Sequence, residues 1–213
     1  MIPHHAHILW TLMLLFTLSS VQSAWAGPPT DQLREGVEQV VKTLKDPQLM
    51  GDSKADERMA AISRLADKIF DFTETAKRAL RQHWAQRTAA EREEFVRLFT
   101  GLIQRTYLSK VDQYNSEMTF QGDTVDGDEA IVRTTLILSK GGELSLNYRM
   151  HQTRDRWQVY DLEVAGISLV ANYRSQFNKI IRADSYETLV ARLKSHQTDL
   201  SAPSMISSGR AER

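Results

Sequence analysis

The side chains that most often do chemistry in proteins are few and scattered in this chain. Downstream of residue 27 there are three histidines, His83, His151 and His196. None of them has a second candidate ligand at a spacing typical of a metal site. The sequence therefore predicts no bound metal.

A Ser-His-Asp arrangement for acyl transfer could be assembled from Ser145, His151 and Asp155. The chain lacks the G-x-S-x-G sequence that positions the nucleophile on a strand-to-helix turn. It also lacks a glycine-rich loop that could hold phosphate groups. We therefore expect no enzymatic activity and no cofactor. An enzyme of similar fold is the alternative, because a fold alone does not exclude catalysis.

Four acidic residues close together, Asp123, Asp126, Asp128 and Glu129, suggest a calcium-binding loop by composition. Their order does not fit the calcium-loop pattern D-x-[DN]-x-[DN]-G. A solvated hairpin turn is the better interpretation of this segment.

The composition excludes several functional classes. The chain has 213 residues, with 27 Lys and Arg against 27 Asp and Glu, and it contains no Cys. A zero net charge argues against a nucleic-acid partner, whose phosphates need clustered basic residues, and against strong attraction to anionic membranes. Disulfides, thiolate chemistry and Cys-ligated metals are impossible. The length fits a single domain.

Residues 1–26 have the features of a secretory signal peptide. They contain no Lys, Arg, Asp or Glu, and the apolar run Ile8–Leu18 is too short to span a bilayer. The small-x-small triplet Ala24-Trp25-Ala26 follows, so we predict cleavage after Ala26 and export of the chain from Gly27 onward. The alternative is an N-terminal core helix, which the break at Gly27-Pro28-Pro29 disfavours.

The first part of the exported chain has helical periodicity. Apolar residues recur every three or four positions, as in helices that bury one face. Thr73 is expected to cap the third helix, and the capping box Thr88-Ala89-Ala90-Glu91 to begin the fourth and longest. The expected helices cover residues 30–45, 53–69, 73–84 and 88–107.

Near Glu117 the apolar period changes from 3.6 to 2, which is typical of strands. Asp126-Gly127 and Gly141-Gly142 predict turns short enough for antiparallel hairpins. After Gly166 the helical period returns, and a last helix begins near the capping-box spacing Asp184-Ser185-Tyr186-Glu187. From Asp199 the pattern disappears. The expected strands cover residues 118–121, 130–139, 144–151 and 156–164. Residues 27–198 are expected to form one domain, and residues 199–213 a flexible tail.

This order of elements predicts an α+β fold, with a four-stranded antiparallel sheet packed against several helices. One face of the sheet is expected to be covered by the long helix and by the helix after Gly166. The apolar stripes could form a filled core or border a ligand cavity, and periodicity alone does not decide between the two.

One segment resembles a known family. Trp157, Tyr160-Asp161, Gly166-Ile167-Ser168-Leu169-Val170, Asn172-Tyr173-Arg174 and Gln176-Phe177 are similar to the signature of the MlaC family of periplasmic phospholipid shuttles. Phe70-Asp71-Phe72, the region of Trp84 and the segment Glu94–Tyr107 resemble the helical half of that family in the same order. The resemblance extends roughly from Leu33 to Leu193.

The resemblance implies a curved sheet and helices enclosing a cavity for the acyl tails of a phospholipid, whose headgroup stays in solvent. It also implies periplasmic transfer of lipid between an outer-membrane lipoprotein complex and an inner-membrane ABC transporter complex with its membrane-anchored lipid-binding subunit. Such transfer would maintain the lipid asymmetry of the outer membrane. A related branch of the family accompanies hopanoid biosynthesis, so a hopanoid carrier is an alternative.

The alternation of the third strand and the stripes of the two helices predict which side chains line that cavity. The two helical stripes are expected to be the only apolar surfaces large enough to oppose the sheet. Tyr173 and Phe177 are expected together on a buried helix face, with Arg174 turned away. The expected lining residues are Leu144, Leu146, Tyr148 and Met150 on the strand, Ile103 and Tyr107 on the long helix, and Leu169, Val170 and Tyr173 on the helix after Gly166.

Overall fold

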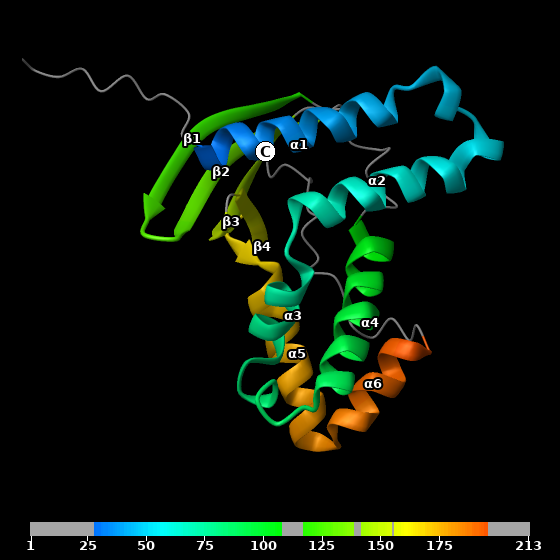
Figure 1. Ribbon diagram of the computed structural model, residues 1–213, viewed down its shortest axis with the longest axis vertical. Coiled ribbons are helices and arrows are strands. Elements are labelled where there is room, and N and C mark those ends of the chain that lie inside the picture. The colour runs from blue at the N-terminus through cyan, green and yellow to red at the C-terminus, as the bar shows by residue number, and fades with distance from the viewer. Residues whose placement is uncertain (1–27, 108–116, 139–141, 155, 196–213) are drawn as a thin grey trace, which may run out of the picture.

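The computed structural model describes residues 28–107, 117–138, 142–154 and 156–195. The expected signal peptide and flexible tail lie outside these residues, as do His196 and Asp155. Helices precede and follow a block of strands (Figure 1), which confirms the α+β class. The helices are Pro28–Leu44 (α1), Ala55–Ile69 (α2), Phe72–Leu80 (α3), Ala89–Tyr107 (α4), Leu169–Ala183 (α5) and Tyr186–Lys194 (α6). The strands are Met118–Asp126 (β1), Glu129–Ile137 (β2), Glu143–Thr153 (β3), Arg156–Val164 (β4) and Ile167–Ser168 (β5).

The sheet is antiparallel throughout and follows the sequence order β1-β2-β3-β4-β5. The expectation of four strands is wrong, because Ile167 and Ser168 pair with the end of β4 before α5 begins. This short return is possible because Ala165 and Gly166 both have positive φ angles and reverse the chain. Periodicity could not show a strand of two residues.

β1 is also longer than expected. It was predicted to end at Gln121 but continues to Asp126, with a register shift between Phe120 and Gly122. As the edge strand it pairs only with β2, and its side chains alternate weakly between buried and exposed positions. A polar edge strand carries little periodic signal, which explains the short prediction.

The start signals of the helices are partly confirmed. Thr88 and Glu91 form the predicted capping box, since the Thr88 N–H donates to the Glu91 carboxylate and the Glu91 N–H donates to Thr88 Oγ1. Two other caps are shifted by one or two positions. Asp71 instead of Thr73 caps α3, and Ser185 instead of Asp184 caps α6. Thr73 and Asp184 also have a side-chain oxygen that could cap a helix. Composition alone could therefore not select between the two candidates at either helix.

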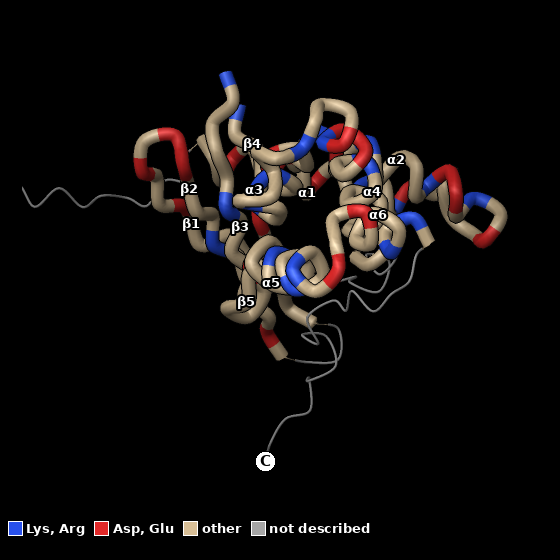
Figure 2. The backbone as a smooth tube through the Cα atoms, turned by 90° about the horizontal axis from the view of Figure 1, so that it is seen from below, with Lys and Arg blue, Asp and Glu red and all other residues tan. Residues whose placement is uncertain are grey.

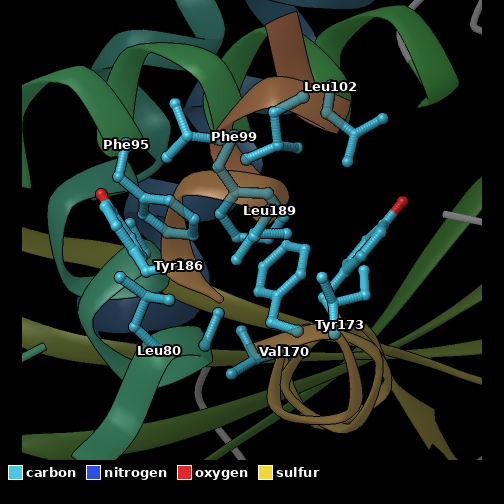
Figure 3. Packing of buried hydrophobic residues seen from close by; sticks show 14 residues of the cluster. Leu80, Phe95, Phe99, Leu102, Val170, Tyr173, Tyr186 and Leu189 are labelled. Atoms are coloured by element: carbon cyan, nitrogen blue, oxygen red, sulfur yellow. The ribbon is translucent and has the colours of Figure 1, made fainter. Parts of the chain in front are cut away.

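Two separate hydrophobic clusters stabilise the fold. The first, which we call the helical cluster, joins α3, α4, α5 and α6 and contains Phe95, Phe99, Tyr173 and Phe177 (Figure 3). The second, the sheet cluster, joins α1 to the inner face of the sheet and contains Leu33, Val132, Met150 and Val159. Tyr173 and Phe177 are both fully buried, as expected.

The helices cover the sheet differently from the expectation. α1 lies across the sheet and contacts β1, β2 and β4, whereas α5 meets β4 mainly through its first turn (Figure 1). α4 packs on α3 and α6 instead of the sheet. The reason is aromatic packing between the α4 and α5 stripes: the ring of Phe99 contacts the rings of Phe177 and Tyr173 edge-on, at centroid distances of 5.1 and 5.2 Å.

Charged residues of both signs are spread over the described elements (Figure 2), in keeping with the zero net charge. α5 differs from the other helices, since its three charged residues, Arg174, Lys179 and Arg182, are all basic. None of the described helices is long and apolar enough to cross a membrane.

Asp161 attaches the start of α5 to β4. Its carboxylate accepts hydrogen bonds from the Val170 N–H at 3.0 Å and from the Ser168 hydroxyl at 2.5 Å, and Ser168 Oγ in turn accepts the Ala171 N–H. Burial raises the pKa of Asp161, and the hydrogen bonds from Ser168 and Val170 only partly oppose that effect. The Asp161 carboxyl therefore fixes the N-terminus of α5, although burial destabilises its ionised form.

We expect Asp161→Ala to lower the free energy of unfolding by about 1–3 kcal/mol, because it leaves the Val170 N–H and the Ser168 hydroxyl without an acceptor. The variant Asp161→Asn keeps one acceptor and does not titrate. Since the folded-state pKa of Asp161 is raised, its stabilising contribution is complete below its unfolded pKa of about 3.9 and declines as the pH rises through the folded-state value.

Urea unfolding at acidic and neutral pH should therefore show Asp161→Asn becoming more stable relative to wild type as the pH rises. A difference between the two proteins that is the same at both pH values would contradict this assignment.

Candidate functional site

An apolar cavity of about 300 Å³ lies where the helical cluster and the sheet cluster meet. Protein interiors are close-packed, with few voids larger than a water molecule, so a space of this size is no ordinary packing defect. Its volume lies at the lower end of the range found for ligand sites. The cavity is therefore the candidate functional site.

Most of the lining is aliphatic or aromatic, and every layer of the fold contributes to it. Many of the aliphatic lining residues are only partly buried, because they face the cavity instead of a neighbouring side chain. The lining residues are Leu33, Val37, Val40, Val41 and Leu44 of α1, Ile62, Ala66 and Ile69 of α2, Phe70, Phe72 and Thr75, Phe99, Ile103, Gln104 and Tyr107 of α4, Met118, Leu136, Leu144, Leu146, Tyr148, Tyr160, Asp161, Leu162 and Val164 of the sheet, and Leu169, Val170 and Tyr173 of α5.

The structure brings eight of the nine residues expected to line a cavity to its wall. They are Ile103, Tyr107, Leu144, Leu146, Tyr148, Leu169, Val170 and Tyr173. The ninth, Met150, shares the strand face with Leu146 and Tyr148 but is only 1% exposed and packs inside the sheet cluster. Met150 lies towards the far end of β3, where the sheet cluster is filled. The alternation of the strand therefore predicted its face correctly, but the cavity does not extend that far.

The largest error of the sequence prediction concerns α1 and α2. These helices supply eight lining residues, whereas α4 and α5 were expected to be the only apolar surfaces facing the sheet. The signal was present, because Leu33, Val37 and Leu44 recur on one helical face. Nothing in that stripe indicated that most of it faces a cavity instead of a filled core.

Gly36 allows the two helices to lie close together. A Cβ atom at this position would come within 2.7 Å of Ile69 Cγ1, which is far below normal contact distance. Ile69 itself lines the cavity. The wall formed by α1 and α2 thus depends on the missing side chain at Gly36.

All four tyrosines on the lining are buried enough for their acidity to change, and burial raises the pKa of Tyr160 as it does the others. Burial raises the pKa of Tyr148 to about 12. Burial also raises the pKa of Tyr107 and of Tyr173, and the two phenols are neighbours that affect each other. All four hydroxyls are therefore protonated and uncharged at physiological pH.

The polar residues considered for catalysis serve other contacts. His151 Nε2 lies 3.1 Å from Asp71 Oδ2, whereas Ser145 is six residues earlier on the same strand, about 20 Å away at the usual rise per residue. His83 contacts Asn178. Ser145 and His151 therefore do not form a catalytic pair.

The acidic segment near the first hairpin joins elements of the fold. The Asp123 carboxylate accepts the N–H and the hydroxyl of Thr30 at 3.0 and 2.8 Å, which ties β1 to the first turn of α1. Glu129 accepts a hydrogen bond from Arg78 of α3. Within the described part of the chain, no group of three or more His, Asp and Glu side chains could hold a metal ion.

Comparison with known proteins assigns the chain to a family. The model of the MlaC protein family matches residues 34–195, which include all the lining residues except Leu33. The chain belongs to the MlaC family. The resemblance seen in the segment Trp157–Phe177 is thereby confirmed.

Two known proteins are similar to this chain over long stretches. The intermembrane phospholipid transport system binding protein MlaC of Haemophilus influenzae is 23% identical over 123 residues, which are 55% of this chain and 58% of that protein. A phospholipid-binding protein from Ralstonia solanacearum, solved in complex with a phospholipid, is 25% identical. The two folds superpose with a TM-score of 0.69, over 83% of this chain and all of that one.

Substituting a larger side chain at two positions of β3 tests whether the cavity is unfilled in the lipid-free protein. Leu146→Trp places a large ring at the cavity wall and should change the free energy of unfolding of the lipid-free protein little. Met150→Trp places the same ring in the filled sheet cluster and should cost about 1–3 kcal/mol through overpacking.

Chemical denaturation of the two lipid-free variants and the wild type measures these changes. Equal and large destabilisation by both substitutions would mean that the region around Leu146 is as closely packed as that around Met150.

Proposed function

We propose that this protein binds a phospholipid, holds its acyl tails in the cavity and carries it between membranes. The observation that supports this most directly is the apolar cavity between the two clusters, in a chain of the MlaC family. The similar Ralstonia protein was solved with a phospholipid bound. The cavity here has no charged cluster on its wall, and its lining is that of a site for hydrocarbon.

The energetics of transfer agree with such a lining. Burying about thirty methylenes of a two-chain lipid is worth about 24 kcal/mol relative to water, at about 0.8 kcal/mol each. A bilayer provides nearly the same stabilisation. A carrier must therefore be about as apolar inside as a membrane, so that loading and release are close to balanced and neither step needs covalent chemistry.

We place this transport in the periplasm. The support is the signal-peptide pattern of residues 1–26 and the family to which the chain belongs. The partners would be an outer-membrane lipoprotein complex and an inner-membrane ABC transporter complex with its membrane-anchored lipid-binding subunit. The physiological role would be to maintain the lipid asymmetry of the outer membrane.

Lipid extraction from protein purified from the periplasm tests the cargo directly. We expect mass spectrometry to find glycerophospholipid in stoichiometric amount in the wild type, and a large loss of lipid from Leu146→Trp. Met150→Trp is the matched control and should retain its lipid wherever it stays folded. Recovery of hopanoids would favour the alternative carrier, and wild-type protein without any lipid would refute the proposal.

The site of export processing has its own test. N-terminal sequencing of the periplasmic protein should begin at Gly27, because Ala24-Trp25-Ala26 fits signal peptidase. Retention of the full chain in the cytoplasm, or a first residue far from Gly27, would contradict export by this segment.

A further inference from the structure

Two tyrosine hydroxyls on the cavity wall have no hydrogen-bond partner. Tyr107 ends α4 and Tyr173 lies in the second turn of α5, and both side chains line the cavity. Both hydroxyl oxygens are buried and lack a partner among the described residues. Tyr173 is 0% exposed, whereas Tyr107 is only partly buried. We call these two residues the tyrosine pair.

The tyrosine pair has one hydrogen-bond donor more than its two hydroxyls can use between them. Tyr107 and Thr106 both lie close enough to Tyr173 to affect its pKa, but neither hydroxyl of the pair has a partner with hydrogen-bond geometry. Even if they turned towards each other, one bond between two hydroxyls would use only one of the two protons. The second proton would then have only the neighbouring Thr106 hydroxyl or a bound molecule as its acceptor, since the surrounding wall is mainly hydrocarbon.

The tyrosine at the opposite end of the helical cluster shows the usual arrangement. The hydroxyl of Tyr186 donates to the backbone oxygen of Glu91 at 3.1 Å, as buried tyrosines normally do. In Figure 3 the rings of Tyr186 and Tyr173 lie on opposite sides of the cluster. The Tyr186 hydroxyl thus has the acceptor that the hydroxyls of the tyrosine pair lack.

The chemistry of the site limits what that acceptor can be. A neutral donor in an apolar wall suits an uncharged acceptor, because a charged phosphate would lose its hydration without a cation to replace it. In a diacyl lipid, the uncharged acceptors are the two ester carbonyls, which join the tails to the glycerol.

We propose that the tyrosine pair donates a hydrogen bond to an ester carbonyl of the bound lipid and so selects ester-linked over ether-linked lipids. This inference rests on the proposed function, because it requires a lipid in the cavity. An ether oxygen is a weaker acceptor than an ester carbonyl, so the same chains and headgroup with ether links lose this bond. The tyrosine pair is thus a specificity-determining element at the boundary between tails and headgroup.

A competition between two synthetic lipids tests the proposal. Lipid-free protein is incubated with vesicles containing equal amounts of a diester and a diether phosphatidylglycerol that have the same chain lengths, and the bound lipids are quantified by mass spectrometry. We expect wild-type protein to bind the diester about fivefold in excess, which corresponds to about 1 kcal/mol for one hydrogen bond. The double variant Tyr107→Phe/Tyr173→Phe should bind both lipids about equally.

The matched control is Tyr186→Phe, which also removes a buried tyrosine hydroxyl but does not line the cavity. It should retain the wild-type preference. A wild-type ratio near one, or an unchanged preference in the double variant, would overturn the proposal. The wild-type ratio alone decides the matter if the double variant does not fold. Failure of the wild type to bind either lipid would instead refute the proposed function, so the two failures are distinguishable.

Discussion

The structure depends on one constraint: an apolar space must stay open inside a small protein whose stability comes from filling apolar space. The chain meets this constraint by packing two clusters separately. Phe95, Phe99 and Phe177 fill the helical cluster, and Val132 and Val159 fill the sheet cluster. The cavity lies where the two clusters meet, so its wall residues are held in place by the packing behind them. Residues such as Phe99 and Tyr148 belong both to a cluster and to the cavity wall, so the packing that stabilises the fold also holds the wall in place.

Polar contacts between the clusters keep the cavity walls in position. The carboxylate of Asp161 fastens the start of α5 to β4, and the Thr75 hydroxyl donates to the backbone oxygen of Tyr160, which fastens α3 to the same strand. Asp71 contacts His151 and caps α3 at the same time. These contacts lie beside the cavity and involve buried or partly buried groups, where a lost partner is costly. They fix the distance between helices and sheet without filling the space between them.

The few polar groups on the wall are uncharged hydroxyls, the uncharged amide of Gln104 and one carboxyl that is already bonded to the backbone of α5. Such a wall resembles the interior of a membrane more than a site for a charged small molecule. Most of the binding energy of a lipid would come from its chains, which every diacyl lipid shares. Selection between lipids would then depend on single hydrogen bonds such as those that the tyrosine pair can donate, each worth a small factor in affinity.

The sequence by itself determined the elements and their faces, because apolar periodicity and capping oxygens act over a few residues. It correctly placed the helix of Phe95–Tyr107 with its capping box, the alternation of Leu144, Leu146 and Tyr148, and the family signature around Asp161. Only the tertiary structure decided that α1 and α2 complete the cavity, that α4 faces α5 instead of the sheet, and that Met150 is core. An amphipathic stripe predicts that one face of a helix is buried. The same stripe can pack against a neighbouring element or border an open cavity. Which of the two it meets depends on contacts between residues far apart in the chain, such as Phe99 with Phe177 and Gly36 with Ile69.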